Sequence, residues 1–280
     1  MAAKPVVAGV DGSPQSVQAV EWAAREAVLR GTTLRLVAVA SMPPRMRPNP
    51  ATPDTVAGHI EQATNQALAA AAGEASDDAP DLPVETRLLD GVAPAQALVD
   101  SGKDALMLVL GSRGAGGFSA LVLGSVSRYA ATHAPCPVVV VREETMAAHR
   151  EVVVGVQDPA QSAAALSFAF EEAALREARL VAMHAWSRSA FGRHDETPDE
   201  EQHALEALLA SWREKYPDVT ASAEVMHAHP GRVLSGASAR ADLVVLGRHA
   251  RGDGSGPGAG SVTHSVLSHA HGPVVSVPGE

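Results

Sequence analysis

The chain of 280 residues is long enough for two ordinary domains, and its hydrophobic content of 46% is normal for a globular core and excludes a disordered chain. Aromatic residues make up only 3%, so a core must consist mainly of alanine, valine and leucine, which suits a parallel sheet covered by helices. The formal charge of −10 weighs against a nucleic-acid-binding surface, and the single cysteine, Cys136, excludes an internal disulfide.

Apolar runs and helix signals alternate along the first half of the chain. The runs 5–10 and 33–40 indicate strands, and between them Ser13 and Pro14 are typical of a helix start, with Gly31 as the stop signal. The elements expected after them are a proline-rich loop over 43–53, helices over 55–73, 94–102 and 125–132, and strands over 84–89, 106–110 and 138–141. No long apolar core of a signal peptide and no membrane-length apolar stretch occurs, so we expect a cytoplasmic protein.

The sequence contains an internal duplication. The segment VVAGV at 6–10 recurs as VVVGV at 152–156. Three further pairs are LMLVLG at 106–111 with DLVVLG at 242–247, GSVS at 124–127 with GSVT at 260–263, and HAPCPVV at 133–139 with HAHGPVV at 269–275. The boundary falls in a polar stretch over 142–150, which predicts two domains over 1–145 and 146–280.

Strands that alternate with helices predict a parallel, doubly wound α/β sheet in each half. In such folds ligands bind beyond the carboxyl ends of the strands, where the winding direction reverses. The residues that directly follow the strands are therefore the candidates for a binding site. Asp11 follows the first strand, where its carboxylate could face a ribose, a base edge or Mg²⁺.

A glycine-rich motif follows the fourth predicted strand. Gly111 and Gly114 are separated by two residues, and nine more residues lead to Gly124 and Ser125 at the start of the next helix. The glycines allow a tight turn close to a ligand, and successive backbone N–H groups in such a turn suit an anion. The helix start adds free N–H groups and a favourable dipole for phosphate, and the hydroxyls of Ser125 and Ser127 could donate to it.

The Gly-2x-Gly-9x-Gly-Ser spacing, with the opening Gly-Val-Asp-Gly-Ser and the closing Gly-Ser-Val-Ser and His-Ala-Pro-Cys-Pro-Val-Val-Val, resembles the ATP-binding universal stress protein family over both halves. The resemblance implies tandem open domains, each a five-stranded parallel sheet flanked by helices, of the adenine nucleotide alpha-hydrolase-like type. It implies ATP, together with Mg²⁺, as the ligand, and a homodimer or an intramolecular pseudo-dimer as the assembly. The residues it assigns to ATP are Gly9, Asp11, Val39 through its backbone, Gly111, Ser112, Arg113, Gly114, Gly117, Gly124, Ser125, Val126 and Ser127.

The second half departs from this pattern. Ala250 replaces the second glycine of the motif, and Gln157 aligns with Asp11, so that the acid, Asp158, has moved by one place. An alanine at a position that requires positive φ costs about 1 kcal/mol, so the sequence leaves ATP binding open in this half, where the final Gly-Ser is intact. The corresponding residues are Gly155, Ala185, Gly247, Gly260, Ser261, Val262 and Thr263.

No catalytic set emerges from the sequence. A Gly-x-Ser-x-Gly elbow with partners and a Walker Gly-Lys-Ser/Thr loop are missing, and the scattered histidines lack the spacing of a zinc site. The phosphate loop has no lysine to hold a γ-phosphate, which argues against fast phosphoryl transfer. We therefore predict no enzyme, with weak ATP hydrolysis at most.

Three functions remain as hypotheses. The first is an ATP-binding regulator of stress or dormancy, as the resemblance implies, in which the nucleotide changes a conformation or a partner contact. The second is a dimeric interaction module with no nucleotide role. The third is a related enzyme, such as an adenylating pyrophosphatase-domain enzyme or an electron-transfer flavoprotein, although the adenylating type requires a Ser-Gly-Gly-x-Asp-Ser loop that is not found after the first strand.

Overall fold

A computed structural model describes residues 3–41, 55–90, 93–114, 123–142, 148–158, 161–186, 197–248 and 260–279. The chain forms two compact units, Met1–Arg142 and Glu143–Glu280. The exact boundary at residues 145 and 146 stays a prediction, because residues 143–147 lie outside the described ranges. The predicted loop over 43–53 also falls wholly outside them.

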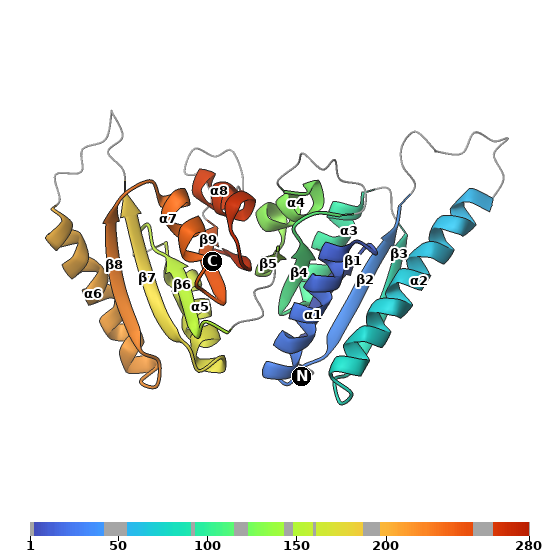
Figure 1. Cartoon of the computed structure of the whole chain (residues 1–280), viewed down its shortest axis with the longest axis horizontal. Helices are drawn as coiled ribbons and strands as arrows, with labels where there is room; N and C mark the ends of the chain where they lie inside the picture. Colours follow the sequence, from blue (N-terminus) through green and yellow to red (C-terminus); the bar gives the residue numbers. More distant parts are fainter. Residues whose placement is uncertain are drawn as a thin grey trace. The chain divides into compact units, whose positions relative to one another are not determined.

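The first unit alternates strands and helices, as the sequence predicts (Figure 1). Its described elements are β1 (Val6–Val10), α1 (Pro14–Leu29), β2 (Leu34–Ala40), α2 (Thr55–Asp78), β3 (Val84–Asp90), α3 (Pro94–Ser101) with a following 3₁₀ turn (Gly102–Asp104), β4 (Met107–Gly111), α4 (Ser125–His133) and β5 (Val138–Val141). The strands are parallel and lie in the order β3-β2-β1-β4-β5. The winding direction therefore reverses between β1 and β4.

The second unit repeats this arrangement. Its described elements are β6 (Glu151–Gly155), α5 (Ala163–Leu175), β7 (Arg179–Trp186), α6 (Pro198–Lys215), β8 (Ala221–His227), α7 (Pro230–Ala237), β9 (Leu243–Arg248), α8 (Ser261–His269) and β10 (Val274–Pro278). The parallel order β10-β9-β6-β7-β8 corresponds strand by strand to β5-β4-β1-β2-β3. The predicted α/β fold with parallel sheets and flanking helices is thus confirmed.

The core of the first unit is built from small aliphatic side chains. All five residues of β1 are buried, and α1 packs on the sheet with a stripe of alanines of which Ala19, Ala23 and Ala27 are fully buried. The helix begins as predicted, because the backbone N–H of Ser16 donates to the Ser13 hydroxyl at 3.2 Å. The low aromatic content therefore matches a core in which helices lie close to the sheet.

Each unit buries one carboxylate on its first helix. Glu26 in α1 and Glu172 in α5 are almost completely buried, and each pairs with the arginine four residues later, Arg30 and Arg176. A buried carboxylate without its partner costs several kcal/mol, so both pairs must be kept together. Sequence reasoning did not single out these pairs, although their spacing is regular.

No helix among the described residues is both long and apolar enough to cross a membrane.

The carboxyl end of β4 lies directly against the first turn of α1. A Cβ atom on Gly111 would come within 2.6 Å of the carbonyl oxygen of Gln15. Because the obstacle is backbone, it cannot rotate away. Gly111 is therefore required for packing of the sheet against α1.

We predict that Gly111→Ala lowers the free energy of unfolding by about 1–3 kcal/mol, because the added methyl group forces the strand and the helix apart. Gly73→Ala is the control, since Gly73 lies inside α2 with open space around it and gains about 0.5–1 kcal/mol of helix stability. Urea unfolding followed by circular dichroism measures both. Equal stability of Gly111→Ala and the wild type would contradict this packing role.

Candidate functional site

A cavity of about 710 Å³ opens at the carboxyl ends of β1, β2 and β4 in the first unit. This is the place where the winding reverses, and it is where ligands of such sheets bind. Predicted residues that line it are Gly9, Asp11, Val39, Gly111, Arg113, Gly114, Gly124, Ser125, Val126 and Ser127. Of the other two predicted residues in this unit, Ser112 is buried beneath the turn, and Gly117 lies outside the described residues.

Asp11 stands at the mouth of the cavity in a fixed orientation. Its Oδ1 accepts hydrogen bonds from the backbone N–H of Ser13 at 3.0 Å and from the Ser13 hydroxyl at 2.6 Å. Its Oδ2 faces Gly114 so closely that a Cβ atom there would collide with it. Gly114 thus leaves room for the carboxylate, which brings the two predicted site residues together.

Ser127 lines the cavity, but its hydroxyl has a partner within the protein. Its side chain is buried, and its hydroxyl donates to the carbonyl oxygen of Gly111 at 2.6 Å. The hydroxyl proton is therefore engaged in holding α4 to the end of β4. Ser125, in contrast, is exposed in the first turn of α4, where its hydroxyl can reach a ligand.

The turn after β4 is closed by the backbone. The N–H of Gly124 donates to the carbonyl oxygen of Ser112 at 2.7 Å, which joins the two ends of the glycine motif. Gly124 is the N-cap of α4 and has no side chain to cap the helix. The N–H groups of the first turn of α4 therefore begin at the cavity wall, where they suit an anion.

The opposite side of the cavity is mostly apolar. Val39 and Ser41 contribute from the end of β2, and three residues of α2, Ala63, Thr64 and Ala67, form the neighbouring wall. Leu98 of α3 and Leu110 of β4 also line the cavity. Sequence reasoning missed the α2 residues because no motif marks them, and only the packing of α2 beside β2 brings them to the site.

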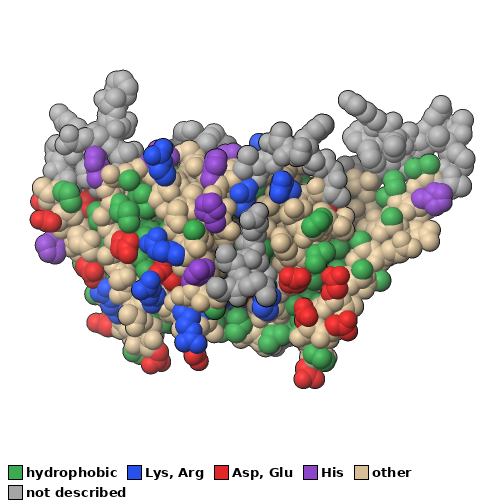
Figure 2. Space-filling view, in the orientation of Figure 1, with side chains coloured by type: hydrophobic (Ala, Val, Ile, Leu, Met, Phe, Trp, Pro, Cys, Tyr) green, Lys and Arg blue, Asp and Glu red, His purple; other side chains and the backbone are tan. Residues whose placement is uncertain are grey.

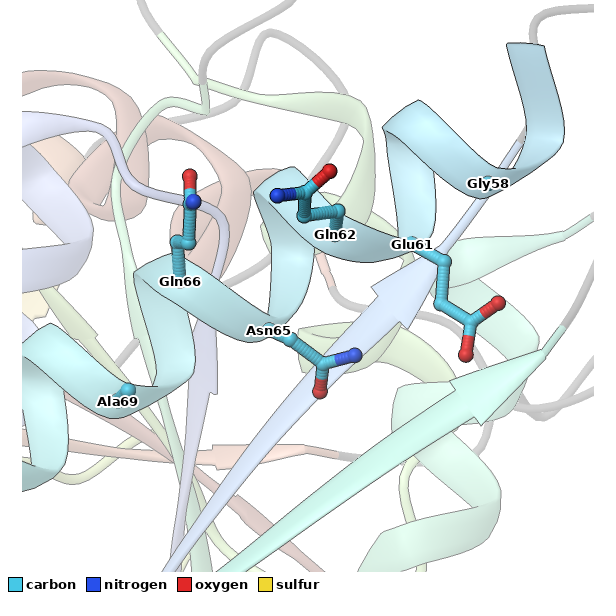
Figure 3. A pocket seen from close by; sticks show the side chains of 6 residues that line it. All are labelled: Gly58, Glu61, Gln62, Asn65, Gln66 and Ala69. Carbon is cyan, nitrogen blue, oxygen red and sulfur yellow. The ribbon is translucent and has the colours of Figure 1, made fainter. Parts of the chain in front are cut away.

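A second hollow, of about 520 Å³, lies on the outer face of α2 (Figure 3). Its six lining residues all belong to this helix and are all exposed: Gly58, Glu61, Gln62, Asn65, Gln66 and Ala69. None of these lining residues belongs to a second element that could form an opposite wall. This surface is not a candidate site.

In the second unit the predicted residues lie at the corresponding strand ends. Gly155 ends β6, Ala185 lies in β7 and Gly247 lies in β9. Gly260 is the N-cap of α8, whose first turn contains Ser261, Val262 and Thr263. Ala250, the alanine of the altered motif, lies outside the described residues.

A histidine fills part of this region in the second unit. The Nδ1 atom of His184, in β7, lies 2.8 Å from the carbonyl oxygen of Val156, and its Nε2 atom lies 3.5 Å from Oε2 of Glu201 in α6. Both side chains are 15% exposed. No motif in the sequence marks either residue.

The first turn of α6 is held by a capping box. The backbone N–H of Thr197 donates to Oε2 of Glu200 at 2.7 Å, and the N–H of Glu200 donates to the Thr197 hydroxyl at 3.4 Å. The bond from the Thr197 backbone, with a smaller contribution from its hydroxyl, lowers the pKa of Glu200 below its ordinary value. This box fixes the turn in which Glu201 lies.

Histidine side chains gather over the second unit on the face shown in Figure 2. Within the described ranges, however, no group of three histidine, cysteine or acidic side chains is placed to hold a metal ion. The prediction that the histidines do not form a zinc site stays a prediction. In the first unit the carboxylate on the cavity wall is Asp11.

The fold and the cavity define a duplicated α/β protein with a ligand-sized hollow at the switch point of its first sheet. The sequence profile of the universal stress protein family matches residues 2–142 and 149–278. A universal stress protein of Mycobacterium tuberculosis is 35% identical over 96% of this chain and 93% of its own length. One from Mycolicibacterium smegmatis is 36% identical over 97% and 96%, respectively.

A solved structure agrees with the fold. The crystal structure of a universal stress protein from Archaeoglobus fulgidus aligns with a TM-score of 0.75 at 17% identity, covering 98% of this chain and 96% of that one. The chain therefore belongs to the universal stress protein family, and the resemblance noted in its sequence is confirmed.

We predict that Ser127→Ala lowers the free energy of unfolding by about 1–3 kcal/mol, because it leaves the buried carbonyl of Gly111 without its donor. Ser125→Ala, an exposed serine in the same turn, should change it by less than about 0.5 kcal/mol. Chemical denaturation of the ligand-free proteins measures both values. A neutral Ser127→Ala would show that this hydroxyl is not structural.

We also predict that Thr197→Ala raises the pKa of Glu200 part of the way toward its ordinary value, because the hydroxyl that donates to the carboxylate is lost while the backbone N–H remains, whereas Thr197→Ser keeps the pKa low. Because the folded-state pKa of Glu200 is lowered, the hydrogen bonds to its carboxylate stabilise the folded protein at pH values above the ordinary pKa. This stabilisation is lost as the pH falls through the lowered pKa. Carboxylate NMR titration reads this group directly. An unchanged pKa in Thr197→Ala would refute the capping assignment.

Proposed function

We propose that the first unit binds ATP in the cavity at the ends of β1, β2 and β4, and that the protein acts as a nucleotide-dependent regulator of stress or dormancy. The observation that carries this proposal is the convergence of Asp11, the Gly111–Gly114 turn and the start of α4 on one cavity. Asp11 lies far in the sequence from the other two segments. The cavity volume of about 710 Å³ is within the usual range for small-molecule sites.

The phosphates belong at the polar end of the cavity. There the start of α4 supplies N–H groups and a partial positive charge, and Ser125 adds a hydroxyl. The exposed guanidinium of Arg113 lines the same wall and can neutralise phosphate charge. Gly114 carries no side chain that would narrow the approach between these groups and Asp11.

The nucleoside belongs at the apolar end, between Val39 and the α2 wall of Ala63, Thr64 and Ala67. Small side chains there leave room for a flat base, and backbone groups at the end of β2 can read its edge. Asp11 lies between the two ends and is oriented by Ser13, so its carboxylate can accept hydrogen bonds from ribose hydroxyls.

Magnesium would arrive with the nucleotide. Mg²⁺ commonly keeps several waters and is held by one or two carboxylates together with substrate phosphates. The described residues contain no three-ligand group for a metal, but they place the Asp11 carboxylate in the cavity wall. ATP phosphates, water and this carboxylate are therefore a suitable set.

The wall residues support binding rather than rapid catalysis. No lysine is among the residues that line the described cavity, and Arg113 is the cation there. Without a fixed lysine near the γ-phosphate, fast transfer lacks its usual electrostatic support. We therefore propose that occupancy by ATP, with weak hydrolysis at most, changes a partner contact. A dimeric assembly and a cytoplasmic location stay predictions.

Thermal unfolding with ATP, ADP and AMP tests this proposal. ATP at a hundredfold excess over its Kd should stabilise the wild type by about 2.7 kcal/mol, which raises Tm by several degrees. Gly114→Glu should abolish the shift, because it fills the turn and repels phosphate.

Gly58→Glu serves as the matched control, since Gly58 is exposed on α2 with nothing within 4 Å and lies outside the cavity wall. It should keep the full shift. A wild type that no adenine nucleotide stabilises at millimolar concentration would remove the proposal and favour the interaction module.

A further inference from the structure

The two units can be aligned residue by residue through their strand registers. Val6 pairs with Leu34 in the first unit, and Val152 pairs with Leu180 in the second. Because 6–10 and 152–156 are repeated segments, Leu34 corresponds to Leu180. Counting along both strands then places His184 where the first unit has Ala38.

The helices that follow can be aligned in the same way. Leu34 pairs with Val84 and Leu180 pairs with Ala221, so β3 and β8 correspond. Asp78, the end of α2, precedes Val84 by as many residues as Lys215, the end of α6, precedes Ala221. The connecting turns carry matching backbone hydrogen bonds, Leu82 to Ala79 and Val219 to Tyr216. Glu201 therefore stands at the position of Thr64.

In this alignment His184 stands in place of Ala38, and Glu201 stands in place of Thr64. In the first unit Thr64 lines the cavity wall, and Ala38 of β2 is a small, fully buried residue. In the second unit an imidazole and a carboxylate stand at these two positions and contact each other. The imidazole also contacts the carbonyl oxygen of Val156, the counterpart of Val10 in the cavity wall.

We infer that the second unit does not take a nucleoside and that each chain binds one nucleotide, with His184 and Glu201 as the residues that exclude the base from the second unit. This inference rests on the function proposed for the first unit. A base in the second unit would have to displace the imidazole from the Val156 carbonyl, leaving that group and the Glu201 carboxylate without their partner. Gln157 in place of Asp11 also removes the carboxylate that would face a ribose.

Isothermal titration of the full chain with Mg²⁺ and ATP measures the number of sites. We expect one ATP per wild-type chain and none for Gly114→Glu, whose substitution lies in the first unit. Two ATP per wild-type chain, falling to one in Gly114→Glu, would overturn the inference while the proposed function stands, whereas one ATP in both proteins would overturn both. A wild type that binds no ATP at all would remove the proposed function, and this inference with it.

Transfer of the carboxylate to the first unit tests the exclusion mechanism. Thr64→Glu places a carboxylate where Glu201 stands and should weaken ATP binding at least tenfold. Asn65→Glu is the matched control, because Asn65 is the next residue of α2, is exposed and lines the hollow on α2 rather than the cavity (Figure 3). It should bind ATP as the wild type does. Equal affinities of Thr64→Glu and Asn65→Glu would contradict the role assigned to this position.

Opening the second unit is the complementary test. The double variant His184→Ala, Glu201→Thr restores the side-chain sizes of the first unit, and adding Gln157→Asp restores the carboxylate. The triple variant should bind a second ATP, whereas His203→Ala with Glu214→Thr, two exposed positions of α6, should still bind one. A folded variant, verified by circular dichroism, that still binds only one ATP after Ala250→Gly is added to the triple variant would show that His184 and Glu201 are not what excludes the base.

Discussion

The site of the first unit depends on how closely the end of β4 approaches the first turn of α1. Gly111 permits this approach, because any side chain there would meet the backbone of Gln15. The Ser127 hydroxyl then ties α4 to the same strand end, and Ser13 fixes the Asp11 carboxylate beside it. The polar end of the cavity is therefore assembled by packing and hydrogen bonds within the protein before any ligand contributes.

The two units show that different residues determine the fold and the site. Both keep the strand order and the helices, and both keep the buried pairs of Glu26 with Arg30 and of Glu172 with Arg176. These features depend on core packing, which the repeats share. The cavity wall depends on a few side chains at strand ends and on one helix face, so an exchange at two of these positions changes the site without changing the fold.

The glycine motif combines two physical roles that its spacing alone does not separate. Gly111 is required for packing, whereas Gly114 leaves space for the Asp11 carboxylate. The serines divide in a similar way, because Ser127 is buried on a backbone carbonyl and Ser125 is exposed at the cavity. Motif recognition predicts that all four lie near the site, but only the packing shows which of them a ligand can reach.

The sequence by itself determined the duplication, the alternating strands and helices, and the family, because periodic apolar runs and glycine spacing are local patterns that can be recognised without a structure. It also located the polar half of the cavity, since residues that follow parallel strands must meet at one edge of the sheet. Only the tertiary structure decided the other half, the α2 wall of Ala63, Thr64 and Ala67, and the pairing of His184 with Glu201. Those contacts join a helix to a strand distant in the chain, and helix rotation and strand register, which no local pattern encodes, decide which side chains meet.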